Sequence, residues 1–226
     1  MQSWTERRRL IPKHKGARAM ENVNLLLILG AALLAGASPG PATLTIAGTA
    51  MQRGRAAGLA LAAGVSSGSL IWSVSAAFGL GAVMLANAWM FEVVRYFGAA
   101  YLMYLAVRSA RSALRSGAPE LRPSAAPSLR AAYAKGLALH LTNPKAILFF
   151  GSLYAIGIPP GTAPSALLVV IAAIAVQSTL IFHGYAILFS SAAASRIYIR
   201  LRRLFEALFA AAFGAASWQI FAARLS

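Results

Sequence analysis

Two prolines interrupt the first long apolar run of the chain. The run "LLAGASPGPAT" (33–43) contains Pro39, Gly40 and Pro41. A proline inside a helix removes one backbone hydrogen bond and clashes with the preceding turn, at a cost of about 3 kcal/mol. A break here would free the carbonyls of Ala35 and Ala37, which must then face protein, water or a ligand. Such carbonyls can accept hydrogen bonds from an ammonium group.

A second apolar run carries a similar break together with a positive charge. The run "LHLTNPKAILFF" (139–150) contains Asn143, Pro144 and Lys145. Pro144 would free the carbonyl of His140, and Lys145 follows the basic residue Lys135 by ten residues, about 15 Å of helix. An ammonium at that depth in a membrane costs roughly 3 kcal/mol and needs a partner. The two breaks suggest a site in which helix amides and Lys145 hold a carboxylate and free carbonyls hold an ammonium.

The composition is that of an integral membrane protein. Of the 226 residues, 59% are hydrophobic and 12% charged, and the mean hydropathy is +0.67. The net charge of +16 comes largely from basic residues between apolar runs, so it reflects membrane orientation and argues against nucleic acid as a partner. The chain has no cysteine and no aspartate, which excludes disulfides and removes most metal ligands. We expect no metal, no cofactor and, without an acid/base pair or nucleophile at depth, no enzyme activity.

Six apolar segments are long enough to cross a membrane as helices, which takes about 20 residues. They are 24–48, 58–84, 91–107, 136–158, 164–190 and 204–222. Two successive groups of three spans run in opposite directions, so matched breaks in the first and fourth segments predict an inverted repeat with a binding site between the broken helices. The expected fold is an all-α integral membrane protein of six transmembrane helices, arranged as two inverted three-helix repeats.

The connections between these segments differ in charge. Those after the first, third and fifth segments contain twelve Lys or Arg, whereas 85–90 and 159–163 contain none. Positive residues are retained in the cytoplasm, so the basic connections are expected inside and both termini outside. The predicted divisions are a basic N-terminal extension (1–20), the first repeat (21–107), a basic cytoplasmic connection (108–135) and the second repeat (136–226). The positive charge of the N-terminal extension favours a cytoplasmic N-terminus and so opposes this orientation. We therefore expect translation to start at Met20, without the extension.

Few ionisable side chains lie in the apolar segments. The candidates for proton coupling are His183, Glu92 and His140. The alternative for the histidines is a packing role with a hydrogen-bonded ring, and for Glu92 an interfacial pair with Arg95. A similar interfacial pair is expected for Glu206, which follows Arg202 in the sequence.

The second segment and its approach carry a series of glycines. They are Gly54, Gly58, Gly64 and Gly68, which fall within an arc of about 120° on a helix. Small residues at this spacing let two helices pack closely. Helix packing is the expected role, a solute passage beside the glycines is the alternative, and dimerisation through them stays open.

Four motifs follow one another along the chain. They are "SPGP" (38–41), "QRGRAAGLALAAGVSSG" (52–68), "GAAYLMYLAVR" (98–108) and "TNPKAILFF" (142–150). In this order and spacing they resemble the LysE/RhtB family of bacterial amino-acid exporters, from about residue 24 to residue 222. The resemblance implies an inner-membrane protein that expels amino acids or related metabolites, driven by the proton gradient. It places Pro39, Gly40 and Pro41 in the first-span break and Asn143, Pro144 and Lys145 in the fourth-span motif.

The expected function is therefore secondary transport by proton antiport with alternating access. The partners would be an amino acid, protons and the lipid bilayer. Two alternatives stay open: a passive channel for small solutes that uses the same cavity, and an assembly subunit without transport activity. An assembly subunit would explain the glycines of the second segment but not the presence of Lys145 in the membrane.

Overall fold

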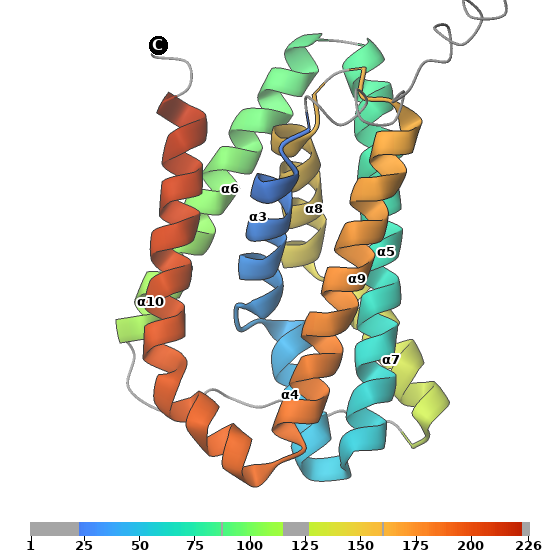
Figure 1. Ribbon diagram of the computed structural model, residues 1–226, viewed down its shortest axis with the longest axis vertical. Helices are drawn as coiled ribbons and strands as arrows, with labels where there is room; N and C mark the ends of the chain where they lie inside the picture. The colour runs from blue at the N-terminus through green and yellow to red at the C-terminus, as the bar shows by residue number, and fades with distance from the viewer. Residues whose placement is uncertain (1–22, 87, 115–126, 160, 223–226) are drawn as a thin grey trace, which may run out of the picture.

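The computed structural model describes residues 23–86, 88–114, 127–159 and 161–222. Over these residues the protein is all-helical, with eight helices and no strand (Figure 1). The helices are α3 (Leu25–Ala37), α4 (Pro41–Arg53), α5 (Arg55–Ala86), α6 (Ala88–Leu114), α7 (Leu129–Leu141), α8 (Pro144–Gly157), α9 (Pro164–Phe189) and α10 (Ala192–Ala222). The N-terminal extension and the middle of the basic connection 108–135 lie outside the described residues.

Both predicted breaks separate two helices. The first segment is split into α3 and α4, which meet at an angle of 50°. The fourth segment is split into α7 and α8. Gly40 and Asn143, the residues before Pro41 and Pro144, are extended, as steric clash with the proline ring requires. Each proline then takes the first position of a new helix, where its missing N–H costs nothing.

Length and hydropathy distinguish the helices. Among the described residues, 55–79 of α5 and the whole of α9 are long and apolar enough to cross a membrane, and the bent pair α3 and α4 makes a third span if counted as one. α6 and α10 contain several arginines, and these charged residues lower the mean hydropathy of both helices. The helical class that the sequence predicts is confirmed, and two to three of the six predicted spans meet this criterion.

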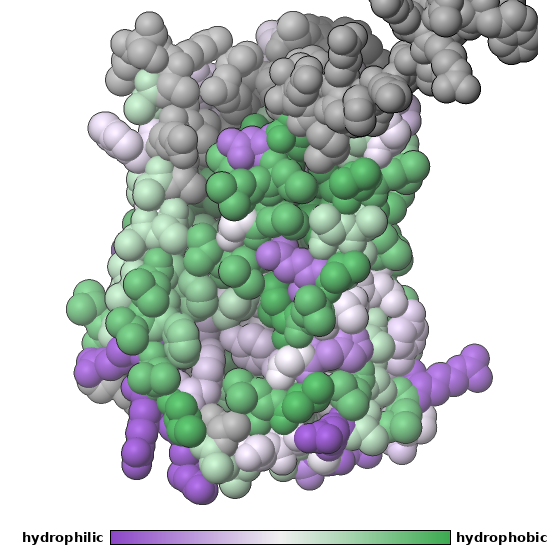
Figure 2. Space-filling model, viewed as in Figure 1, coloured by the Kyte–Doolittle hydropathy of each residue, from purple (hydrophilic) through white to green (hydrophobic). Residues whose placement is uncertain are grey.

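The described ends of the basic connections lie at one end of the molecule. In Figure 1 the α4–α5 and α9–α10 junctions and the beginning of α7 lie at the lower end, opposite the beginning of α3 and the end of α10. The end of α6 lies against the early turns of α10, where Arg203 Nε donates to the carbonyl of Ala113 at 3.2 Å. Figure 2 shows hydrophilic residues concentrated at this lower end and a mostly hydrophobic surface above them.

The core is centred on α3 and α8. Ile28 of α3, Tyr154 of α8 and Phe213 of α10 belong to one buried cluster, and Ile46, Leu61 and Phe182 to a second cluster between α4, α5 and α9. The hydroxyl of Tyr154 forms a buried hydrogen bond with Ser73 of α5. At the breaks, Ser38 and Asn143 are buried between the helices, as irregular backbone at membrane depth requires.

Glycines allow α5 and α7 to pack with their backbones in contact. A Cβ on Gly64 would collide with the carbonyl of Tyr133 in α7, and one on Gly136 of α7 would collide with the carbonyl of Leu61 in α5. Any larger residue would force the two helices apart.

The other glycines of the predicted series have different surroundings. A Cβ on Gly58 would lie 2.8 Å from Ala50 Cβ of α4, and one on Gly68 would lie 2.9 Å from His140 Cβ of α7. Gly54 departs from the expected packing role, because a Cβ there would meet nothing within 4 Å. Its φ of 84° ends α4 in the left-handed region that glycine tolerates. The glycines that do pack face α4 and α7 of the same chain, which removes that surface from a dimer interface.

Candidate substrate site at the broken helices

Lys145 connects the two breaks. It lies in the first turn of α8, and its Nζ donates to the carbonyls of Ala35 at 3.0 Å and of Ser38 at 3.3 Å. Nζ also forms a short hydrogen bond with Ser38 Oγ. These acceptors belong to the last turn and C-cap of α3, where the helix dipole concentrates partial negative charge. The partner that the buried charge needs is therefore a helix end, not an acidic side chain.

Each carbonyl freed by a proline has a partner. Ala35 O accepts from Lys145 and from the Ser38 hydroxyl, the latter at 3.0 Å. Ala37 O accepts from the hydroxyl of Tyr185 on α9 at 2.6 Å. The carbonyl of His140 accepts within its own turn from the N–H of Asn143 at 3.2 Å.

The new helix N-termini differ in how their amides are used. Asn143 Oδ1 caps α8 by accepting from the N–H of Lys145 at 3.1 Å. At α4 the N–H of Gly40 donates to Thr43 Oγ1 at 2.9 Å, while the amides of Ala42 and Thr43 have no backbone partner within the described part of the chain. The N-terminus of α4, rather than that of α8, thus offers free donors.

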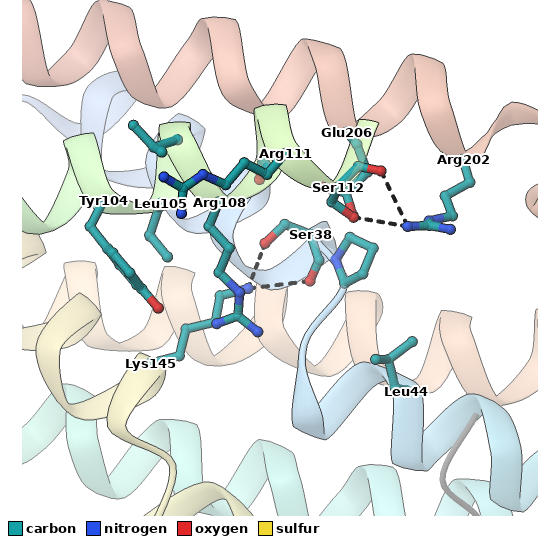
Figure 3. Close-up of a pocket in the computed structure, with 13 residues that line it drawn as sticks. Ser38, Leu44, Tyr104, Leu105, Arg108, Arg111, Ser112, Lys145, Arg202 and Glu206 are labelled. Atoms are coloured by element: carbon teal, nitrogen blue, oxygen red, sulfur yellow. Dashed lines mark hydrogen bonds between the residues drawn. The ribbon is translucent and has the colours of Figure 1, made fainter. Parts of the chain in front are cut away.

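A cavity of about 430 Å³ opens beside Lys145, between the α3–α4 break, α6 and α10 (Figure 3). Its polar lining consists of Ser38, Tyr104, Arg108, Ser109, Arg111, Ser112, Lys145, Arg202 and Glu206. Figure 3 shows Arg108 reaching toward Ser38 and Lys145. Four cationic side chains against one carboxylate give this cavity, which we call the basic cavity, a field that attracts carboxylate groups.

Glu206 lies in the basic cavity and is buried, with 3% of its surface exposed. Its Oε1 accepts from the hydroxyl of Ser112 on α6 at 2.8 Å, and that hydroxyl in turn accepts from Arg202 Nη2 at 2.9 Å. The sequence predicted an interfacial pair of this carboxylate with a preceding arginine. The structure links Glu206 to Arg202 through Ser112 and also buries the carboxylate, because α6 packs over this face of α10.

A smaller cavity of about 50 Å³ lies on the other side of Lys145, and we call it the inner cavity. Gly40, Thr43, Ser69, His140, Asn143 and Ser178 contribute to its lining. His140 Nε2 lies 3.2 Å from Ser69 Oγ, whereas its buried Nδ1 has no partner among the described residues. Ser38 and Lys145 line this cavity as well as the basic cavity.

The predicted proton-coupling residues are not gathered in one place. His140 faces the inner cavity. His183 is half-buried, and its Nδ1 bonds to the carbonyl of Thr179 in its own helix at 2.9 Å, away from both cavities. The side chain of Glu92 lies outside the described part of the structure.

Comparison with known proteins identifies the family. The profile of the LysE type translocator matches residues 26–223. The chain belongs to this family. The threonine efflux protein of Escherichia coli strain K12 is 30% identical to this translocator over 179 residues, which cover 78% of the chain and 86% of that protein. An uncharacterised membrane protein of Pseudomonas aeruginosa is 36% identical over 156 residues, covering 65% of the chain and 72% of that protein.

A third relative of this LysE type translocator aligns with a shorter part of the chain. The leucine efflux protein of Salmonella choleraesuis is 35% identical over 116 residues, 51% of the chain and 54% of that protein. No solved structure matches the chain. The family is one of membrane transporters rather than enzymes, and the resemblance that the motifs indicated is confirmed.

Several residues that line the translocator's basic cavity or bond to its first break were absent from the sequence-based candidates. They are Ser38, Tyr185, Glu206 and Arg108. Ser38 had a signal in the sequence, because it directly precedes Pro39 and a serine at a helix end bonds to local backbone. The other three come from helices whose approach to the break only the tertiary structure reveals.

Proposed function

We propose that this translocator exports neutral amino acids across the bacterial inner membrane by proton antiport with alternating access. The observation that carries the proposal is the position of Lys145, which bonds the break of the first span and lies between two cavities. Relatives named as threonine and leucine efflux proteins support an outward direction of transport and amino acids as the class of solute.

In this proposal α3–α4 and α7–α8 are the broken first and fourth spans of two inverted three-helix repeats. The matching Pro41 and Pro144, each starting a helix after an extended residue, support the repeat. The basic end of the molecule faces the cytoplasm and both termini lie outside, in agreement with the retention of positive charge. The basic cavity is then the cytoplasmic vestibule.

The substrate would bind at the residues that form the two breaks. They are Pro39, Gly40, Pro41, Asn143, Pro144 and Lys145. Lys145 and the free amides of α4 suit the carboxylate, and the carbonyls of Ala35 and Ser38 suit the ammonium. Arg108 and the other arginines of the basic cavity would repel a cationic side chain, which favours neutral amino acids.

Proton coupling needs an ionisable group within reach of the solute. Glu206 meets this condition in the basic cavity, and His140 meets it in the inner cavity. His183 and Glu92 also remain candidates. His183 lines neither cavity, and the side chain of Glu92 lies outside the described part of the structure.

The test is the amino-acid profile of the medium around cells that produce the protein and are fed mixed dipeptides. We expect selective release of a few neutral amino acids, lost in Lys145→Ala and retained in Lys135→Ala. Lys135 is the matched control because it is an exposed lysine of α7 outside both cavities.

An uncoupler separates the alternatives. Release that stops when the proton gradient collapses agrees with antiport, whereas release that continues down a concentration gradient identifies a passive channel. A profile identical to that of cells without the protein, with the protein present in the membrane, would overturn amino-acid export.

A further inference from the structure

The three acceptors around Lys145 form a site that matches a primary ammonium group. They are Ala35 O, Ser38 O and Ser38 Oγ, and we call them the ammonium site. The Ser38 hydroxyl donates its own hydrogen to Ala35 O at 3.0 Å, so only its lone pairs face Lys145. The site therefore presents acceptors alone. A cation with three N–H donors satisfies all of them, and the ammonium of Lys145 has that number.

The ammonium site lies where the two cavities meet. Among the described residues, Ser38 and Lys145 are the two that line both the basic cavity and the inner cavity. The hydrogen bonds between them therefore lie at the wall that the two cavities share. Separation of these two side chains would open a path from one cavity to the other.

Donors for a carboxylate lie directly beside the ammonium site. A Cβ on Gly40 would be 3.4 Å from Lys145 Nζ, which shows how close the start of α4 comes. The backbone amides of Ala42 and Thr43 follow on the inner-cavity side, without a backbone partner in the described chain. His140, with 5% of its surface exposed and its Nδ1 unpartnered, lines the same cavity. Acceptors and donors thus stand side by side, as an α-amino acid requires.

We propose that Lys145 occupies the substrate's own ammonium site in this conformation, and that a primary ammonium group of the substrate displaces it. This inference rests on the proposed export of amino acids. The displaced Lys145 then faces the substrate carboxylate, and its separation from Ser38 joins the two cavities. The substrate class narrows to zwitterions with a primary ammonium. Glycine betaine has no N–H donor and a hydroxy acid has no cation, so neither displaces Lys145.

Chemical complementation of purified Lys145→Ala tests the ammonium site directly. The substitution removes a group with the size and charge of propylammonium. Propylammonium at tenfold excess over its dissociation constant should raise the midpoint of thermal unfolding by roughly 3 to 6 °C. Tetramethylammonium and 1-propanol should not. Wild type and Lys135→Ala should not respond to any of the three, because Lys145 fills the site and none of these solutes carries a carboxylate to pair with a displaced Lys145.

A second measurement uses the wild-type protein and does not depend on the stability of the variant. Thermal unfolding is followed with L-threonine and with its N-trimethyl derivative, and we expect stabilisation by the first alone. Equal responses to the two, or equal responses of Lys145→Ala to propylammonium and tetramethylammonium, would overturn the ammonium site. Absence of amino-acid export by the wild-type protein, together with selective propylammonium binding by Lys145→Ala, would instead overturn the proposed function and leave the ammonium site in place.

Discussion

At the scale of single residues, the charge of Lys145 is balanced by two carbonyls and a hydroxyl at one helix end. Binding to such a set of acceptors depends on the shape of the cation as well as on its charge. An ammonium directs three donors toward a small volume, whereas a guanidinium spreads its donors in a plane. The size and geometry of the side chain at this position therefore matter for function.

Lys145→Arg should abolish export although it keeps the positive charge. The planar group does not match the three acceptors, and the start of α4 leaves little room beside them. Export of neutral amino acids from dipeptide-fed cells is the measurement, with Lys135→Arg as the control on an exposed position of α7. Wild-type export by Lys145→Arg would show that charge alone suffices.

Gly40→Ala should weaken substrate binding without unfolding the protein. The φ of −163° at Gly40 is open to alanine, but the added methyl would lie 3.4 Å from Lys145 Nζ. This is ordinary van der Waals contact, so the fold is kept, but the methyl takes space that a bound substrate needs. A loss of about 1 kcal/mol in binding free energy corresponds to a roughly fivefold loss of affinity. The comparison is Gly151→Ala in α8, where a Cβ meets nothing within 4 Å. Equal export affinities for the two variants would contradict this prediction.

Tyr185→Phe should destabilise the fold by about 1 to 3 kcal/mol, because the part-buried carbonyl of Ala37 loses its hydrogen-bond donor. The measurement is thermal unfolding in detergent. Tyr133→Phe is the control, since its exposed hydroxyl bonds to Ser67 and solvent can replace that bond. A change of less than about 0.5 kcal/mol for Tyr185→Phe, the size usual for surface positions, would show that Ala37 finds another donor.

At the scale of secondary-structure elements, the contact between α5 and α7 depends on two residues without side chains. Gly64→Ala and Gly136→Ala each place a methyl against a backbone carbonyl of the opposite helix, so each should destabilise the protein by about 1 to 3 kcal/mol or more. Gly184→Ala in α9, where a Cβ meets nothing within 4 Å, should be neutral or stabilising. Thermal unfolding of the three variants provides the comparison. A similar midpoint for all three would mean that α5 and α7 are less closely packed.

The sequence predicted the elements better than the contacts between them. Pro39 and Pro41 act on carbonyls only four residues away, so the break and the groups it frees were open to local reasoning. The donors that return to those carbonyls are remote, with Lys145 at a separation of 110 residues and Tyr185 at 148. In an apolar helix the faces toward lipid and toward protein are both apolar, so hydropathy does not indicate which face meets which neighbour. Burial of Glu206 under α6 escaped prediction for this reason.

At the scale of the whole molecule, the native chain has no cysteine, so a single introduced thiol reports access to one cavity without background. Ser178→Cys lies in the inner cavity and Ser109→Cys in the basic cavity. With a small hydrophilic thiol reagent applied from the cytoplasmic side, Lys145→Ala should accelerate labelling at position 178. Labelling at 109 should proceed at the same rate with and without that substitution. Unchanged labelling at 178 would show that Lys145 does not separate the cavities.

The contacts between the two halves also have a consequence for biosynthesis. α5 packs mainly on α7 and α9, and α6 mainly on α10, so these helices of the first half find their principal partners in the second half. A ribosome that has completed α6 has inserted helices whose neighbours have not yet been made. At that stage the glycines of α5 do not yet have α7 to pack against, and the carbonyl of Ala35 does not yet have Lys145 as a donor. Final assembly of the helices therefore follows synthesis of the whole chain. We expect a product truncated after α6 to be unstable and to be degraded by membrane proteases.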